Sequence, residues 1–199
     1  MSDEDLLQLM IGGDEDAFVL LFRKRQGAIY RFALQMTGSE ATADDVTQEV
    51  FMALLRSASR FDPSRGPLLS FLYGIARNQV LRRLERDRPF LPLDRPETDG
   101  DEVAELVDRR DPLMDLTRNE LIEGVRQTVL TLPQHYREAV VLCDLHEMSY
   151  AETAEVLGCA VGTVRSRLHR ARAMLLERLR PRVEADTDSI NAGVMRSLV

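Results

Sequence analysis

The sequence predicts an all-α protein made of two small helical domains joined by a flexible linker. Across residues 14–86 and 113–181, apolar side chains recur at steps of three and four, which places them on one face of a helix. Between these regions, residues 89–110 mix Pro, Gly and acids without a sustained period, as linkers do. The β-branched residues fall inside the helical periods, so no strand is predicted.

The first domain is expected at residues 14–88, after a polar lead-in at 1–13 that holds a short helix, Asp5–Met10. The Pro- and Gly-containing stretch 61–67 has the composition of a loop. The helices predicted around one apolar centre are 14–36, 41–58 and 68–86. A polar tail at 182–199 is weakly periodic and is expected to fray.

The second domain is expected at residues 111–181, because Asp111-Pro112 is a favourable helix start and Leu132-Pro133 restarts the helical pattern. Within it, Ser149 and Glu152 have the spacing of a capping box, and Gly158 suits the tight turn that follows. Predicted buried positions of this motif are Ala151, Ala154, Leu157, Val161, Val164, Leu168, Ala171 and Leu175.

A second set of residues in the last helix is basic and keeps the same rhythm on another face, as Arg165, His169 and Arg172 show. This pattern predicts a helix-turn-helix whose cationic helix fits the DNA major groove, about 12 Å wide. An ordinary helical hairpin with a solvated arginine face is the alternative.

Composition limits the classes of protein. Hydrophobic residues make up 44% and charged residues 30%, as in soluble domains. No apolar run is long enough for membrane insertion, and the acidic start is unlike a secretory signal. Cys143 and Cys159 alone do not form a disulfide framework, so a cytoplasmic protein is expected.

The net charge of −7 conceals an uneven distribution. Acids crowd the N-terminal part and residues 94–115, while arginines crowd 77–88 and 165–182. Two basic DNA-facing surfaces and acidic surfaces for another partner fit this asymmetry. The low overall charge also predicts weak non-specific DNA affinity for the isolated chain.

Three segments follow one another along the chain, with the predicted linker between the second and the third: DDVTQEVF at 44–51, IARN at 75–78 and GTVRSRLHRAR at 162–172. With them the chain resembles the extracytoplasmic-function (ECF, group 4) sigma factors of bacterial RNA polymerase, over roughly residues 14–86 and 128–180. The resemblance implies sigma region 2 in the first domain and sigma region 4 in the second. It implies core polymerase (the β′ clamp helices and the β flap), promoter DNA and an anti-sigma factor as partners, with no cofactor.

The resemblance also implies roles by position. Asp45, Gln48 and Glu49 match the face that docks on the β′ clamp-helix coiled coil. Ser64, Arg65, Asn78 and Arg82 match the part that reads the −10 element, where the family holds a flipped base in a pocket. Arg165, Ser166, His169 and Arg170 match the part that enters the major groove at the −35 element.

Four positions depart from the family pattern. Phe71 stands where the family usually has Trp, Gly74 where a basic residue is common and Leu81 where Asp is frequent, which bears on the −10 preference. Thr153 replaces an aliphatic residue in the first helix of the helix-turn-helix.

Three other classes of protein are alternatives to a sigma factor. A zinc enzyme would need a ligand set, but only Cys143 and His146 have helical spacing, and the sequence has no motif of a hydrolase or a phosphate-binding loop, so no metal site or catalysis is expected. A helix-turn-helix repressor or activator that acts without core polymerase leaves residues 14–86 unexplained. An adaptor would turn its arginines to an acidic protein.

Overall fold

The computed structural model describes residues 1–86 and 118–196, and the surroundings of side chains for residues 1–86 and 123–179. The predicted linker, 89–110, and residues 111–117 of the predicted second domain lie outside this part. Within the described residues every regular element is helical and no strand occurs, which confirms the predicted fold class.

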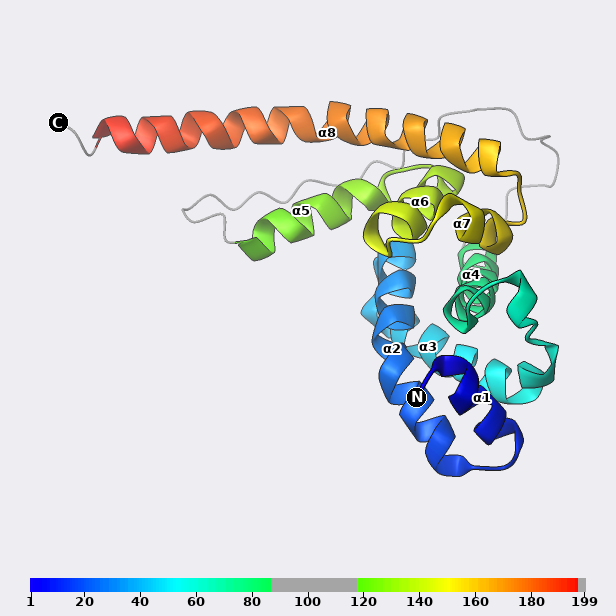
Figure 1. The fold of residues 1–199 in the computed structure, drawn as a ribbon. Coiled ribbons are helices and arrows are strands. Elements are labelled where there is room, and N and C mark those ends of the chain that lie inside the picture. Colours follow the sequence, from blue (N-terminus) through cyan, green and yellow to red (C-terminus); the bar gives the residue numbers. More distant parts are fainter. Residues whose placement is uncertain (87–117, 197–199) are drawn as a thin grey trace.

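Figure 1 shows the helices in space, with α1 and α8 at opposite ends of the molecule. In chain order the elements are α1 (Asp3–Ile11), α2 (Glu15–Thr37), α3 (Glu40–Ser57), η1 (Ala58–Arg60), η2 (Pro63–Arg65), α4 (Leu68–Arg86), α5 (Arg118–Leu130), α6 (Gln134–Val140), η3 (Val141–Leu145), α7 (Tyr150–Leu157) and α8 (Val161–Arg196).

Side-chain caps explain where the first helices begin. The hydroxyl of Ser2 accepts from the backbone N–H of Asp5, whose carboxylate accepts from Ser2 in return, a capping box. Asp14 and Ser39 cap α2 and α3 with one side-chain bond each, accepting from the backbone N–H of Ala17 and Thr42. Gly38 ends α2 with a φ of 71°, in the left-handed region that favours glycine.

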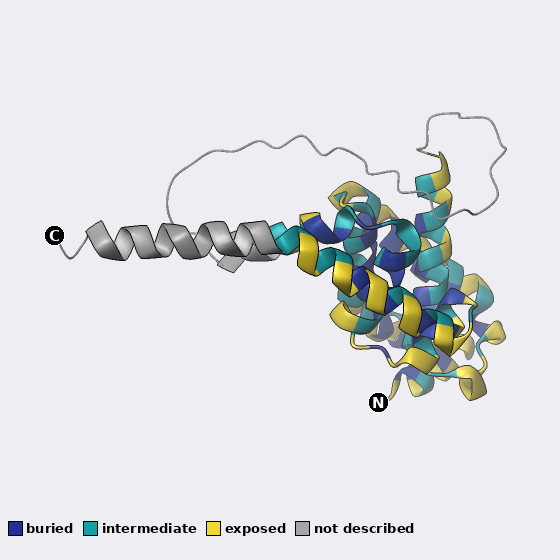
Figure 2. Cartoon of the chain, turned by 90° about the horizontal axis from the view of Figure 1, so that it is seen from above, coloured by how far each residue is buried: buried dark blue, intermediate teal, exposed yellow. Residues whose placement is uncertain are grey.

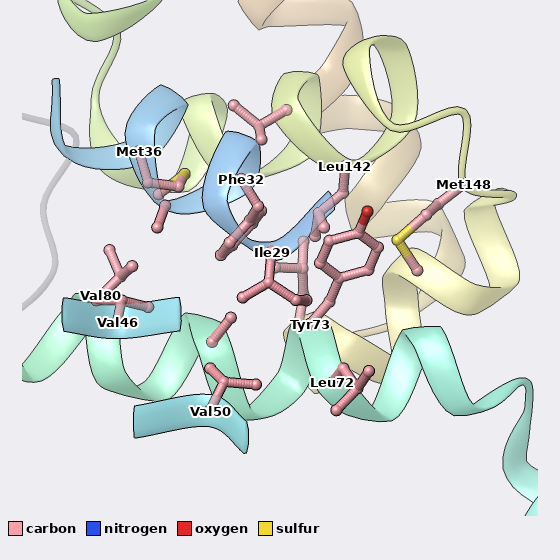
Figure 3. Packing of buried hydrophobic residues seen from close by; sticks show 14 of the residues in the cluster. Ile29, Phe32, Met36, Val46, Val50, Leu72, Tyr73, Val80, Leu142 and Met148 are labelled. Atoms are coloured by element: carbon pink, nitrogen blue, oxygen red, sulfur yellow. The ribbon is translucent and has the colours of Figure 1, made fainter. Parts of the chain in front are cut away.

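Apolar faces of α2, α3 and α4 meet in the core of the first domain. Ile29, Phe32 and Met36 of α2 lie against Leu72 and Val80 of α4 (Figure 3). Their side chains are at most 1% exposed, and burial of each such side chain contributes about 1.5–3 kcal/mol. The core therefore holds the helix faces that the periodicity predicted.

The same apolar cluster continues without a break into the second domain. Phe32 and Tyr73 belong to the first domain, with ring centroids 5.5 Å apart, and Leu142 and Met148 from the second domain lie beside them (Figure 3). The ring of His146 packs 5.0 Å from that of Tyr73. The two predicted domains thus share one core in this structure.

Polar contacts also cross between the domains. Arg77 of α4 donates from Nε and Nη2 to the two carboxylate oxygens of Glu138 in α6, at 2.8 and 3.4 Å. The Tyr73 hydroxyl lies 2.7 Å from Nδ1 of His146, and Nε2 of His146 lies 2.8 Å from Oε1 of Gln35. Arg137 donates to the backbone oxygen of Met36, at 2.6 Å.

A π-helical turn, η3, interrupts the helical path between α6 and α7. Its backbone hydrogen bond runs from the N–H of His146 to the oxygen of Val141, five residues back, so the turn holds one residue more than an α-helical turn. After this turn, the side chain of His146 lies against Tyr73 and Gln35 of the first domain.

Some sequence predictions were wrong. Ala151 and Val161, expected in the buried stripe of the second domain, are exposed, because they lie at the starts of α7 and α8 rather than within the packed faces. Helix α8 continues to Arg196, through most of the tail expected to fray. Figure 2 shows buried and exposed residues alternating along the described part of α8, which marks its packed side.

Gly38 and Gly158 allow a matched substitution test. A Cβ at Gly38 would lie 2.7 Å from Cδ1 of Leu130, whereas a Cβ at Gly158, with a similar φ of 65°, would meet nothing within 4 Å. We expect Gly158→Ala to cost about 1–2 kcal/mol from backbone strain alone, and Gly38→Ala to cost about 1 kcal/mol more because Leu130 must move. Urea unfolding measures both; equal losses would contradict the close approach.

The buried ring of His146 predicts a pH dependence of stability. Burial, assisted by the charge of Arg31, lowers the pKa of His146 to about 4, and unfolding returns it to about 6.5. The unfolded chain therefore binds the extra proton first, so the free energy of unfolding is highest above pH 6.5 and falls by up to about 3 kcal/mol toward pH 4.

Urea unfolding between pH 7.5 and 4.5 measures this loss. The carboxyl groups of Asp3 and Asp62, whose pKa values are lowered, act only below about pH 4. We expect His146→Gln to remove the slope and the exposed matched variant His169→Gln to keep it. The same slope in both variants would show that His146 is not its source.

Candidate nucleic-acid interface

The predicted helix-turn-helix is present and comprises α7, a turn at Gly158 and the first half of α8. Ser149 and Glu152 form the expected capping box at the start of α7, and Gly158 ends that helix with a left-handed backbone. Val164 and Leu168 of α8 are buried against the rest of the second domain, at 2% exposure or less. The basic row of α8 consequently faces outward.

The four residues expected at the major groove lie together on the outer side of α8. Arg165, Ser166, His169 and Arg170 are all exposed, and their positions fall within about 140° of the helix circumference at 100° per residue. The guanidinium of Arg165 lies 5.8 Å from the ring centroid of Tyr150, a cation–π contact that orients it. Ser166 donates its hydroxyl proton to the backbone oxygen of Thr163.

Arg172, on the same helix, is held by an acid that the sequence pattern did not reveal. Its Nε and Nη2 donate to the two carboxylate oxygens of Asp144, at 3.0 and 2.6 Å, and this pair raises the pKa of Arg172. Arg172 therefore stabilises the contact of α8 with η3, and it is less available for a phosphate than its place in the basic row suggests.

A cavity of about 360 Å³ lies beside η2 and α4. Among the residues expected at the −10 element, Arg65 and Asn78 line it, whereas Ser64 and Arg82 do not. The hydroxyl and backbone N–H of Ser64 both donate to Oδ1 of Asp62, so Ser64 holds the loop in shape. Arg82 is exposed on α4, one turn beyond Asn78.

Aromatic rings form the apolar part of this cavity. Phe61 and Phe71 both line it, and their rings meet edge to face with centroids 5.8 Å apart. Phe71, which stands where a Trp is usual, therefore supplies a wall of the cavity. The hydrogen bonds from Ser64 to Asp62 lower the pKa of that carboxyl and keep an acid at the rim charged.

The cavity also has a wall from the second domain, which sequence reasoning missed. Glu155 and Val156 of α7 line it, and Oε2 of Glu155 pairs with Nη2 of Arg65 at 3.1 Å. These residues stand 90 positions apart in the chain, so no local pattern could bring them together.

A third surface, on α3, carries the residues expected to dock on the polymerase. Asp45, Gln48 and Glu49 are exposed there, and Arg83 of α4 pairs with both acids, at 3.1 and 2.7 Å. Because the side chain of Arg83 is only 14% exposed, it fixes the two carboxylates from below. Met52 and Leu55 extend this surface with apolar side chains that are 52% and 45% exposed.

Within residues 1–86 and 123–179, no three His, Cys, Asp or Glu side chains gather as metal ligands would. Cys143 lies 3.3 Å from the Thr153 hydroxyl, and burial raises the pKa of its thiol. Thr153, fully buried, thus finds a polar partner where an aliphatic residue was expected. No helix in the described part of the chain is long and apolar enough to cross a membrane.

The chain thus combines a domain with an exposed basic helix-turn-helix and a domain with a loop cavity and an acidic face on α3, an arrangement typical of a two-domain DNA-binding transcription protein. Comparison with known families agrees. A family model described as Sigma-70 region 2 matches residues 21–89, and one described as Sigma-70, region 4 matches residues 122–175. The ECF RNA polymerase sigma factor SigW of Bacillus subtilis is 34% identical over 176 residues, which cover 84% of this chain and 91% of SigW. The chain belongs to the ECF sigma factors.

Solved structures show the same fold. The structure of CnrH in complex with the cytosolic domain of CnrY has a TM-score of 0.67 at 28% identity, over 91% of this chain and 99% of that one. The sigma factor RpoE of Bartonella quintana, in complex with the anti-sigma factor NepR, has a TM-score of 0.59 at 25% identity, over 81% and 94% of the two chains.

Proposed function

We propose that this chain is an alternative sigma factor that brings core RNA polymerase to promoters with −35 and −10 elements and helps to open the duplex. The observation that carries this proposal is the presence, in one chain, of an exposed basic helix-turn-helix and a cavity lined by Arg65 and Asn78. A repressor would use the first feature and has no use for the second. Catalysis belongs to the polymerase, and the cytoplasm, where polymerase works, is the proposed location.

For the −35 element, the outer side of α8 supplies the base contacts. Arginine can donate two hydrogen bonds to a guanine edge, and Arg165 is oriented by Tyr150 at the end of α8 that meets the turn. Ser166, His169 and Arg170 extend this surface over one further turn of the helix. The domain that carries it spans residues 111–181 in this proposal.

For the −10 element, the cavity of the first domain, residues 14–88, receives a flipped base. Flipping costs a few kcal/mol of stacking, which hydrogen bonds and apolar contacts in a pocket must replace. The amide of Asn78 can donate and accept, and Phe61 and Phe71 provide the apolar walls. Ser64 acts by shaping the loop, and Arg82 binds backbone phosphate.

For core polymerase, α3 supplies the docking surface. Arg83 fixes Asp45 and Glu49 before binding, so less side-chain entropy is lost when they meet a basic coiled coil. Gln48, Met52 and Leu55 complete the surface with polar and apolar contacts.

An anti-sigma factor is a further proposed partner. CnrH and the Bartonella RpoE were both solved with another protein bound, the cytosolic domain of CnrY and the anti-sigma factor NepR. Their similarity to this chain supports the proposal that such a factor holds it inactive until a signal arrives.

Reconstituted transcription tests the function and the α3 surface together. Core polymerase with this chain should initiate on a genomic promoter library, and Asp45→Asn with Glu49→Gln should weaken core binding about tenfold, because two charged contacts are lost. Glu40→Gln, on the opposite side of α3, is the matched control and should bind normally. Failure of core and chain to initiate on any promoter would refute the proposed function; unchanged binding of the double variant would remove α3 from the interface.

If Arg165 reads a base of the −35 element, Arg165→Gln should lower promoter affinity in a sequence-specific way. Promoter affinity of the holoenzyme should fall about 5- to 150-fold on the preferred −35 sequence and much less on a scrambled one, since a bidentate guanine contact contributes about 1–3 kcal/mol. Arg23→Gln, an exposed arginine of α2, controls for the lost charge. Equal losses on both sequences would instead make Arg165 a phosphate contact.

A further inference from the structure

The two DNA-reading domains of this chain lie directly against each other, and α7 of one forms a wall of the cavity in the other. We propose that the free chain blocks its own −10 cavity with α7, and that core polymerase docks on this closed form before the domains separate. The inference rests on the proposed function, because it takes the cavity to be the −10 site.

The closed form depends on a buried ion pair that only the two domains together can make. Only 2% of the Glu138 side chain is exposed, and both of its carboxylate oxygens bind Arg77. Removing one partner of a buried pair leaves an uncompensated charge, so such a pair specifies one geometry far more strictly than apolar contact does. The arrangement is therefore a defined docking of one domain on the other.

His146 adds a second specific contact. Both of its ring nitrogens meet side chains of the first domain: Nε2–H donates to Oε1 of Gln35, and Nδ1 accepts from the Tyr73 hydroxyl. One donor and one acceptor are what a neutral imidazole offers. Burial lowers the pKa of His146, which keeps the ring in that neutral form.

Closure places an acid where DNA would bind. Glu155 pairs with Arg65, the cation of the cavity, and Val156 narrows the same wall. Since both members of this pair are more than half exposed, it adds little to stability. Its effect is to neutralise the arginine and to repel a nucleic-acid backbone from the cavity.

Promoter reading requires this contact to break. The −35 and −10 elements are named for positions about 25 base pairs apart, which at 3.4 Å per base pair is about 85 Å along B-DNA. Two domains in direct contact cannot occupy both elements, so the closed form and the promoter-bound form exclude each other.

Closure leaves the docking surface for polymerase open. Asp45, Gln48 and Glu49 on α3 are exposed in the closed form, as are Arg165 and its neighbours on α8. Of these proposed contact surfaces, the second domain covers the −10 cavity, through Glu155 and Val156 of α7. Core can therefore bind first, and the energy of docking can be used to separate the domains, so that the −10 strand is read only by assembled holoenzyme.

The test uses the full chain with Tyr73→Phe and Glu138→Gln, which removes the hydroxyl contact to His146 and the negative charge of the buried pair without touching the proposed DNA or core surfaces. The control, Glu177→Gln, makes the same charge change on the exposed side of α8. Small-angle scattering and hydrogen exchange of α4 and α7 report opening. Fluorescence anisotropy reports binding to a labelled single strand that spans the −10 region of a promoter found by reconstituted transcription.

The double variant should have a larger radius of gyration, faster exchange in α7 and at least tenfold tighter binding to the strand without core; wild type and control should stay compact and bind weakly. If the double variant does not fold, Tyr73→Phe alone takes its place, because it keeps the ring packing. It should shift the radius of gyration, the exchange rate and the strand affinity in the same direction. An extended wild type that binds the strand as well as the double variant refutes self-inhibition, and initiation with core then still upholds the proposed function. If the double variant opens but binds the strand no more tightly, α7 does not block the cavity. If core and the wild-type chain fail to initiate transcription while the wild type is compact, only the proposed sigma function is contradicted.

Discussion

The ion pair between Arg77 and Glu138 is the contact on which the arrangement of the two domains depends. It joins α4 to α6, one helical turn from Tyr73, and the Glu138 side chain is only 2% exposed. Apolar side chains around it, such as Phe32 and Leu142, supply the energy of burial but tolerate sliding. A bidentate pair is directional, so it favours one orientation of the second domain on the first.

The charge distribution acquires a structural meaning from this interface. The net charge of −7 does not show that several arginines already form ion pairs. These pairs are Arg77 with Glu138, Arg83 with Asp45 and Glu49, and Arg172 with Asp144. Such pairs position helices and remove cations from the pool that could bind phosphate. The weak non-specific DNA affinity expected from composition therefore follows from the paired arginines as well as from the excess of acids.

Sequence reasoning reached the features that are local in the chain. Capping by Ser149, the turn at Gly158 and the buried stripe through Val164 depend on neighbours within a few residues, and the structure has all of them. The interface between the domains could not be predicted, because its partners stand 61 to 111 positions apart and each looks like an ordinary surface residue alone. The roles of the promoter and polymerase contacts came from family resemblance and remain predictions.

The π-helical turn η3 connects the interface between the domains with the helix-turn-helix. Each residue of an α-helix turns the chain by about 100°, so one extra residue re-aims everything that follows it. In this chain that extra residue brings His146 to Tyr73 and Gln35. Loss of a single residue within η3 would rotate His146 away from Tyr73 and Gln35, and it would also displace Cys143 and Asp144, which contact Thr153 of α7 and Arg172 of α8. One turn therefore sets both the contact between the domains and the support of the helix-turn-helix.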